Sequence, residues 1–169
     1  MYYTEKALDQ IYIKELPSIR VASYKIISSR PELDAMNYMK DLIQREQLNF
    51  YDLRKFGFDF TVSPTQHKIG LRGYELWVCL PDEFKNPIEA TIKNIPCGNY
   101  AILRIKNPFG KPFDNISNGW LELHDWVQKS IYQPAIHHPD SYMLEEFIIT
   151  EGITFIDLYY PVCKIEIQN

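Results

Sequence analysis

Several short stretches of the chain alternate hydrophobic and polar residues, which is the pattern of β-strands. The clearest run places Phe56, Phe58, Phe60 and Val62 at every second position. Other stretches are rich in β-branched and aromatic residues, which favour strands. We therefore predict strands at residues 15–27, 55–62, 73–81, 94–106, 141–149 and 154–165.

Two further stretches carry apolar residues at the spacing of amphipathic helices. In the first, Pro31 suits an opening helical turn, and Ser29 with Glu32 fits a capping box. In the second, Asp114 or Ser117 is the expected N-cap. The apolar positions are Ala35, Tyr38, Met39 and Leu42 in the first helix, and Ile116, Trp120, Leu123, Val127 and Ile131 in the second.

The predicted elements occur twice in the order strand, helix, strand, strand. The repeats span about residues 11–82 and 91–167, and no linker-like segment separates them. We therefore predict one domain, residues 1–169, of the α+β class. A duplicated β-α-β-β unit would form a mostly antiparallel sheet covered by two helices. The glycine-containing turn at 150–153 suits a hairpin, whereas 63–72, 107–115 and 133–141 are predicted loops.

The composition narrows the possible functions. Hydrophobic residues make up 46% of the chain, which is enough to bury a core. A net charge of −4 and the lack of any run of more than two Lys or Arg residues argue against direct nucleic-acid binding. The absence of a long apolar segment or a signal-peptide pattern predicts a cytoplasmic protein without membrane contact.

The chain has no motif typical of a metal or cofactor site. Cys79, Cys97 and Cys163 are too far apart for a zinc or disulfide framework. His137 and His138 are adjacent, and adjacent side chains rarely face one metal ion. We therefore expect neither a metal nor a cofactor.

The candidate functional residues are acidic residues inside two apolar strands. Glu75 precedes Trp77 by two positions, and Asp157 precedes Tyr159 by two positions in the second repeat. Strand alternation puts the acid and the ring of each pair on one face. Either the acids lie on a solvated sheet face, or they line an aromatic pocket that suits a lipophilic cation or general acid–base chemistry.

A third acidic position lies in the strand at 141–149. Glu145 alternates with Met143 and Phe147, whereas Glu146 alternates with Leu144 and Ile148. Both sets are otherwise apolar, so alternation alone does not decide which carboxylate faces inward.

The order of these motifs resembles the gyrase-inhibitor-like (GyrI-like) effector-binding domains, as in BmrR-type and some AraC-type transcription regulators. The resemblance covers about residues 10–167. It rests on the segments LPSIRVA, GYELWVCLP, ISNGWLELHDWV, LEEF and IDLYYPV. The family fold is a duplicated β-α-β-β unit with a ligand cleft between the halves, which agrees with the repeat found here.

The resemblance implies a binding site for amphipathic compounds that are cationic or aromatic. In the family's Phe-Glu-x-Tyr strand motif, Leu144 takes the Phe position, Glu145 the Glu position and Phe147 the Tyr position. Glu145 would be the central countercharge, with Glu75 and Asp157 as further acids. The rings expected around the ligand are those of Trp77, Tyr100, Trp120, Phe147 and Tyr159.

The resemblance also leaves two alternative functions. Some family members hydrolyse cyclopropane-containing toxins with a pocket glutamate, so Glu145 would be catalytic if the chain is a hydrolase. Others inhibit DNA gyrase by protein–protein contact. We favour stand-alone binding of small molecules, for drug or toxin sensing or sequestration, with a gyrase subunit or a transcription regulator as a possible partner.

Overall fold

Two prolines, Pro17 and Pro96, mark the points where the chain passes between its two units. The first unit is Ser18–Ile95, and the second combines Met1–Pro17 with Pro96–Asn169. The computed structural model describes residues 11–85, 88–96, 98–135 and 141–164. Each unit is an antiparallel sheet with a long helix against it.

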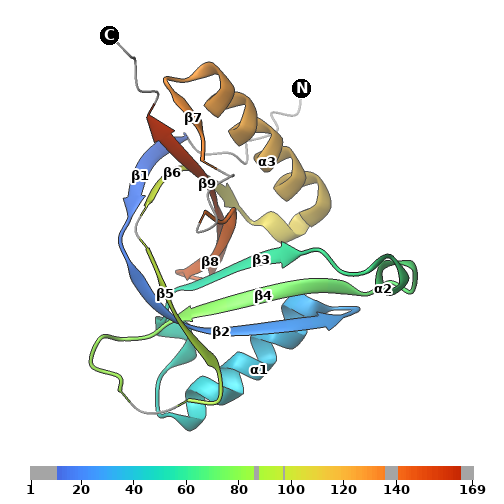
Figure 1. Cartoon of the computed structure of the whole chain (residues 1–169), viewed down its shortest axis with the longest axis vertical. Coiled ribbons are helices and arrows are strands. Elements are labelled where there is room, and N and C mark those ends of the chain that lie inside the picture. The colour runs from blue at the N-terminus through green and yellow to red at the C-terminus, as the bar shows by residue number, and fades with distance from the viewer. Residues whose placement is uncertain (1–10, 86–87, 97, 136–140, 165–169) are drawn as a thin grey trace. The chain divides into compact units, whose positions relative to one another are not determined.

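The first unit carries its long helix on one face of its four sheet strands (Figure 1). Its elements are β2 (Ile19–Ser28), α1 (Pro31–Arg45), the 3₁₀ helix η1 (Phe50–Asp52), β3 (Lys55–Phe60), α2 (Pro64–Lys68), β4 (Arg72–Cys79) and β5 (Thr91–Ile95). The strands pair in the order β3-β4-β2-β5. Helix α1 packs against β2 and β4, and the short α2 lies at the tip of the β3–β4 hairpin.

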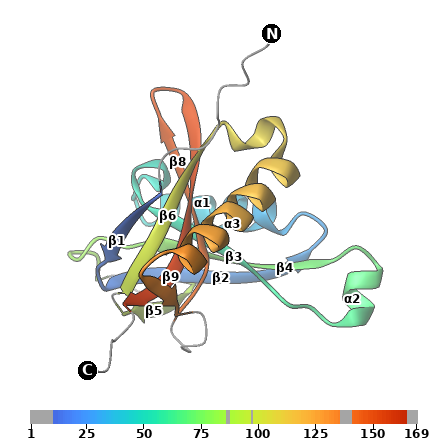
Figure 2. The same cartoon turned by 90° about the horizontal axis from the view of Figure 1, so that it is seen from above.

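The second unit repeats this plan with one extra short strand. Its elements are β1 (Tyr12–Leu16), β6 (Gly98–Lys106), the 3₁₀ helix η2 (Pro108–Gly110), α3 (Pro112–Lys129), β7 (Tyr132–Pro134), β8 (Leu144–Thr150) and β9 (Ile153–Lys164). The strands pair in the order β1-β6-β9-β8, and β7 pairs with the end of β9. Helix α3 crosses β6 and β9 (Figure 2).

A glycine allows α3 to lie close to its sheet. A Cβ atom at Gly119 would lie 2.7 Å from Cδ1 of Ile105 and 2.9 Å from Cδ1 of Leu158. Leu123 and Val127 continue the same helix face into the core of this unit. The core residues are Ala101, Leu103, Ile105, Leu123, Val127, Ile156, Leu158, Tyr160 and Val162.

The predicted α+β class and the repeated β-α-β-β order are confirmed. The predicted hairpin at 150–153 is also present, because Glu151 and Gly152 form a two-residue turn with φ values of 52° and 77°. Positive φ at both turn residues matches the twist of the flanking strands. The prediction that residues 1–169 form a single domain stays a prediction.

The first strand of each predicted repeat is in fact two strands. The predicted strand 15–27 is divided at Pro17 into β1 and β2, and 94–106 is divided at Pro96 into β5 and β6. Proline has no backbone N–H to donate to a ladder, so it interrupts a central strand. As a result β1 pairs with β6, and β5 pairs with β2.

The predicted helix caps are wrong. Helix α1 begins after Arg30 without a side-chain cap, and the Ser28 hydroxyl instead donates to Asp34 at 2.6 Å. Helix α3 begins at Pro112, before Asp114 and Ser117.

All three predicted loops contain some regular structure, since 133–141 begins with the last two residues of β7. The segment 63–72 holds α2, where Ser63 and Gln66 form a capping box. The segment 107–115 contains η2 and the first turn of α3. Residues 136–140 of the third predicted loop, with His137 and His138, lie outside the described residues.

Gly57 on β3 allows a close cross-strand contact with the Tyr74 ring. A Cβ atom there would overlap the phenol of Tyr74. We therefore expect Gly57→Ala to lower the free energy of unfolding by about 1–3 kcal/mol, the usual cost of overpacking. Urea denaturation measures this change. The control is Gly98→Ala on β6, where the nearest atom is 3.6 Å away; equal stability of Gly57→Ala and wild type would contradict the contact.

Candidate functional site

Glu75 and Trp77 lie on the side of the first sheet that faces away from α1. Tyr24 stacks on Tyr38 of α1 with ring centroids 4.0 Å apart, and Tyr24 pairs with Leu76 across β2 and β4. Because strand side chains alternate, the neighbours Glu75 and Trp77 point to the opposite side. We call this side the distal face of the first unit.

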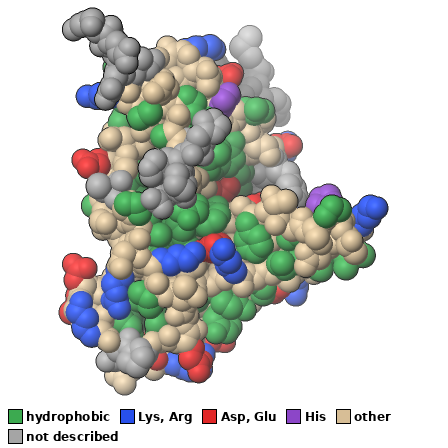
Figure 3. All heavy atoms as spheres, viewed as in Figure 1, with side chains coloured by type: hydrophobic (Ala, Val, Ile, Leu, Met, Phe, Trp, Pro, Cys, Tyr) green, Lys and Arg blue, Asp and Glu red, His purple; other side chains and the backbone are tan. Residues whose placement is uncertain are grey.

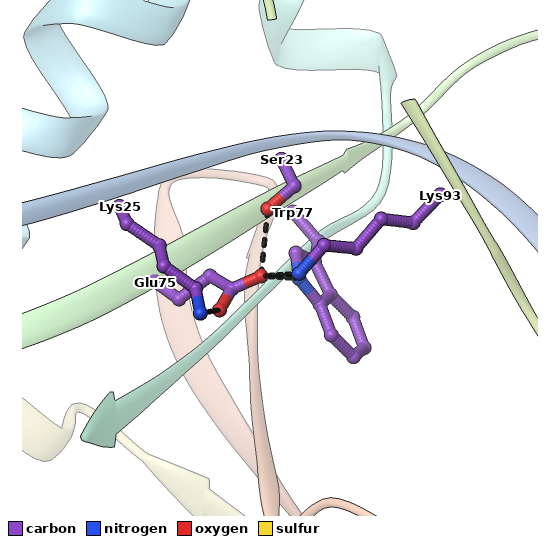
Figure 4. A network of polar contacts seen from close by, with 5 residues as sticks. All are labelled: Ser23, Lys25, Glu75, Trp77 and Lys93. Atoms are coloured by element: carbon purple, nitrogen blue, oxygen red, sulfur yellow. Dashed lines mark hydrogen bonds and ion pairs between the residues drawn. The ribbon is translucent and has the colours of Figure 1, made fainter. Parts of the chain in front are cut away.

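The Glu75 carboxylate is 2% exposed and is surrounded by donors from three strands. Its Oε1 atom accepts hydrogen bonds from Ser23 Oγ at 2.6 Å, from Trp77 Nε1 at 2.6 Å and from Lys93 Nζ (Figure 4). Its Oε2 atom lies 3.2 Å from Lys25 Nζ. The buried carboxylate is therefore compensated by two ammonium groups and two neutral donors.

These contacts decide the charge state of Glu75. Burial raises the pKa of the carboxyl, but hydrogen bonds from Lys93, Ser23 and Trp77, with the charge of Lys93, outweigh burial and hold the pKa below its ordinary value of 4.5. The side chain is therefore ionised at neutral pH.

Aromatic rings frame this carboxylate. The Phe58 and Trp77 rings meet edge to face with centroids 5.0 Å apart. Lys93 Nζ lies 5.8 Å from the centroid of Trp77, and Lys25 Nζ lies 5.6 Å from that of Phe60. Both ammonium groups thus combine an ion pair with a cation–π contact. Figure 3 shows basic side chains gathered with hydrophobic ones on the visible surface over β4 and β5.

The second unit carries a related cluster on the side of its sheet away from α3, which we call its distal face. Arg104 donates to both oxygens of Asp157, from Nε and from Nη2, at 2.7 Å each. Asp157 is 2% exposed, and it pairs across the strands with Glu146. The Tyr159 hydroxyl donates to Oε2 of Glu146, which is 5% exposed.

Tyr100 completes this cluster. Its ring meets that of Tyr159 edge to face with centroids 5.7 Å apart, and its side chain is buried. Burial, with a smaller contribution from Tyr142, raises the pKa of Tyr100 above its ordinary value of 10.0. The phenol therefore stays neutral, and this distal face presents two buried carboxylates beside two aromatic rings.

The structure separates the residues predicted around Glu145. Glu145 lies on the α3 side of the sheet, where Trp120 Nε1 donates to its Oε1 atom at 3.2 Å. Phe147 and Trp120 pack against the core of the second unit. Glu146, and not Glu145, lies on the face that carries Asp157 and Tyr159. A ligand-binding role for Glu145 stays a prediction.

The other predicted acids and rings are placed as the strand alternation indicated. Glu75 lies beside Trp77, and Asp157 lies on the same face as Tyr159. Sequence reasoning missed the cations that neutralise these acids, which are Lys25, Lys93 and Arg104. The available signal was a basic residue in an otherwise apolar strand, as at Arg104 between Leu103 and Ile105.

Metal-binding clusters and membrane-spanning helices were both sought in the described part of the chain. No group of three or more His, Cys, Asp or Glu side chains there could hold a metal ion. Among the same residues, none of the helices has the length and apolarity needed to cross a membrane.

Comparisons with known proteins agree on the fold. The model of the Cass2 family, described as integron-associated effector binding protein, matches residues 12–162. No curated protein matches the sequence. The crystal structure of the EcmrR C-terminal domain has a TM-score of 0.65 at 17% identity, covering 92% of this chain and 98% of that one.

Two further structures extend this likeness. EcmrR in its DNA complex has a TM-score of 0.66 at 16% identity, covering 96% of this chain, which spans only 60% of the EcmrR chain. SAV2435 bound to tetraphenylphosphonium has a TM-score of 0.52 at 10% identity, covering 92% of this chain and 94% of that one. The predicted GyrI-like fold is confirmed.

Removing the Glu75 charge tests the compensation described above. At pH 7 we expect Glu75→Gln to lower the free energy of unfolding by about 2 kcal/mol, the scale of hydrogen bonds to a charged group. Because the folded-state pKa of Glu75 is depressed, its contribution is present above the unfolded pKa of about 4.5 and disappears as the pH falls through the folded-state value. Urea denaturation between pH 7 and pH 3 measures the difference.

The exposed Glu83 provides the control for this series. Glu83→Gln should change the unfolding free energy little at any pH in the range, because its side chain is solvated. A difference between wild type and Glu75→Gln that stays constant from pH 7 to pH 3 would contradict the ion-pair account.

Proposed function

The chain belongs to the Cass2 family of integron-associated effector binding proteins, and we propose that its effector is an aromatic organic cation bound on the distal face of the second unit. Binding of a small molecule follows from the family. The cationic and aromatic character of the ligand is our inference from the side chains on that face.

The buried Glu146 carboxylate beside the rings of Tyr100 and Tyr159 is the main support for this ligand class. Asp157 on the same face receives a bidentate contact from Arg104, so its charge is compensated within that pair. Glu146 adds a second carboxylate next to the aromatic rings. A carboxylate in aromatic surroundings favours a ligand that brings a diffuse positive charge and flat rings.

The comparison with SAV2435 supports the same ligand class. That protein was solved with tetraphenylphosphonium, which is a lipophilic cation with four phenyl rings. Tetraphenylphosphonium is therefore a suitable probe ligand for the test that follows.

Glu146 and Glu145 form a matched pair for the test, because they are neighbours on β8 with side chains on opposite faces. We expect Glu146→Gln to weaken tetraphenylphosphonium binding at least about tenfold, which is ~1.4 kcal/mol. Glu145→Gln should change the affinity less than about twofold. Isothermal titration calorimetry measures both.

The two variants also separate competing assignments. Equal affinity of wild type and Glu146→Gln would remove Glu146 from the site, and a selective loss in Glu145→Gln would restore the assignment expected from the family motif. Hydrolysis of cyclopropane-containing compounds and inhibition of gyrase stay predictions.

A further inference from the structure

Glu75, the buried acid of the first unit, has cationic partners of a different kind from those of Asp157 in the second unit. Glu75 is contacted by two flexible lysines, whereas Asp157 is held by one planar guanidinium. Lys93 is 29% exposed, and it is the less exposed of the two lysines. Lys25 is the direct cross-strand partner of Glu75, whereas Lys93 comes from a more distant strand.

Lys93 reaches Glu75 across an intervening strand. It lies on β5 and pairs with Val21 of β2, whereas Glu75 lies on β4 beyond β2. Neighbouring strands are about 4.8 Å apart, so only a long side chain spans this interval. The small Ser23 lies on β2 between the residues that pair with Lys93 and with Glu75, and Figure 4 shows Lys93 extending past Trp77 to the carboxylate.

The surroundings of the Lys93 ammonium are those of a bound organic cation. The ammonium group contacts the carboxylate of Glu75, which is 2% exposed. Its Nζ atom lies 5.8 Å from the centroid of the Trp77 ring. A buried countercharge beside an aromatic face is how proteins recognise free ammonium ligands. Here the cation is supplied by the chain itself.

We propose that Glu75, Trp77 and Ser23 form an ammonium-binding site that the side chain of Lys93 occupies. Lys93 is thus a specificity-determining residue, because it keeps free organic cations out of the first unit. A tethered group acts at a high effective concentration, so a free monocation at micromolar concentration does not displace it. This inference concerns a different unit and different residues from the proposed effector site.

Removal of Lys93 should open the site without removing its other parts. Lys25 contacts the other carboxylate oxygen and lies over Phe60, so within the described part of the chain Oε1 keeps its neutral donors, Ser23 and Trp77. An n-butylammonium ion has the four carbons and the charge of a whole lysine side chain, which is one carbon more than the group that Lys93→Ala removes. The ligand class of the opened site is therefore a primary alkyl- or arylalkylammonium.

The experiment is rescue of Lys93→Ala with n-butylammonium. Labelling with 5-fluorotryptophan places a ¹⁹F probe on each of the three tryptophans of the chain. Trp77 is the only one among residues 18–95, and the Trp77→Phe variant identifies its resonance. We expect n-butylammonium to shift this resonance saturably in Lys93→Ala, at concentrations at least tenfold below any effect in wild type. n-Pentanol, which has a similar length and no charge, should not reproduce the shift.

Two further variants make the result specific. Glu75→Gln combined with Lys93→Ala should abolish the response to n-butylammonium. Lys40→Ala is the matched control, because Lys40 also lies over a ring, that of Tyr51 at 5.5 Å, and no ion pair with an acid is found for it in the described residues. It should gain no response.

Each outcome decides the inference. It is overturned if Lys93→Ala fails to respond, if n-pentanol acts equally well, or if the response survives Glu75→Gln. If Lys93→Ala does not fold, refolding in n-butylammonium but not in n-pentanol is the expected result, and no refolding in either overturns the inference. Loss of the effector site at Glu146 would leave the Trp77 response unchanged, so the two proposals fail separately.

Discussion

Removing a carboxylate from water costs several kcal/mol unless charges and donors replace its hydration. This constraint organises the distal faces of both units. Each inner strand carries an acid that is 2% exposed, Glu75 on β4 and Asp157 on β9, and the compensating cations come from β2 and β5 in the first unit and from β6 in the second. On these faces, β2, β5 and β6 therefore present the donors and cations that the acids require.

The repeated units solve this problem with different chemistry. Arg104 has a rigid planar fork that fits both oxygens of Asp157, so that pair is fixed in geometry. Lysines are flexible point charges, so Lys93 and Lys25 compensate Glu75 without imposing a single planar geometry on it. A duplicated fold thus presents two faces with different polar partners, although the acids and aromatic rings of their inner strands occupy related positions.

Strand alternation predicted much of this arrangement. It placed Glu75 with Trp77 and Asp157 with Tyr159, because the side-chain period of a strand is independent of its partners. It could not choose between Glu145 and Glu146, because both alternating sets on β8 are apolar and only the packing of α3 decides which side is covered. Alternation could not identify the compensating cations either. Which acid Lys93 or Arg104 contacts depends on the strand order and register, which the sequence pattern does not give.

The crossing of the chain at Pro17 and Pro96 affects how the protein can be divided. Residues 18–95 contain all four sheet strands of the first unit, β5 included. Residues 96–169 lack β1, so a fragment cut at the midpoint of the repeat would leave one edge of β6 without its neighbour. An unpaired edge of this kind recruits strands from other molecules. Fusions, permutations and truncations that preserve the fold must therefore keep residues 12–16 available to β6.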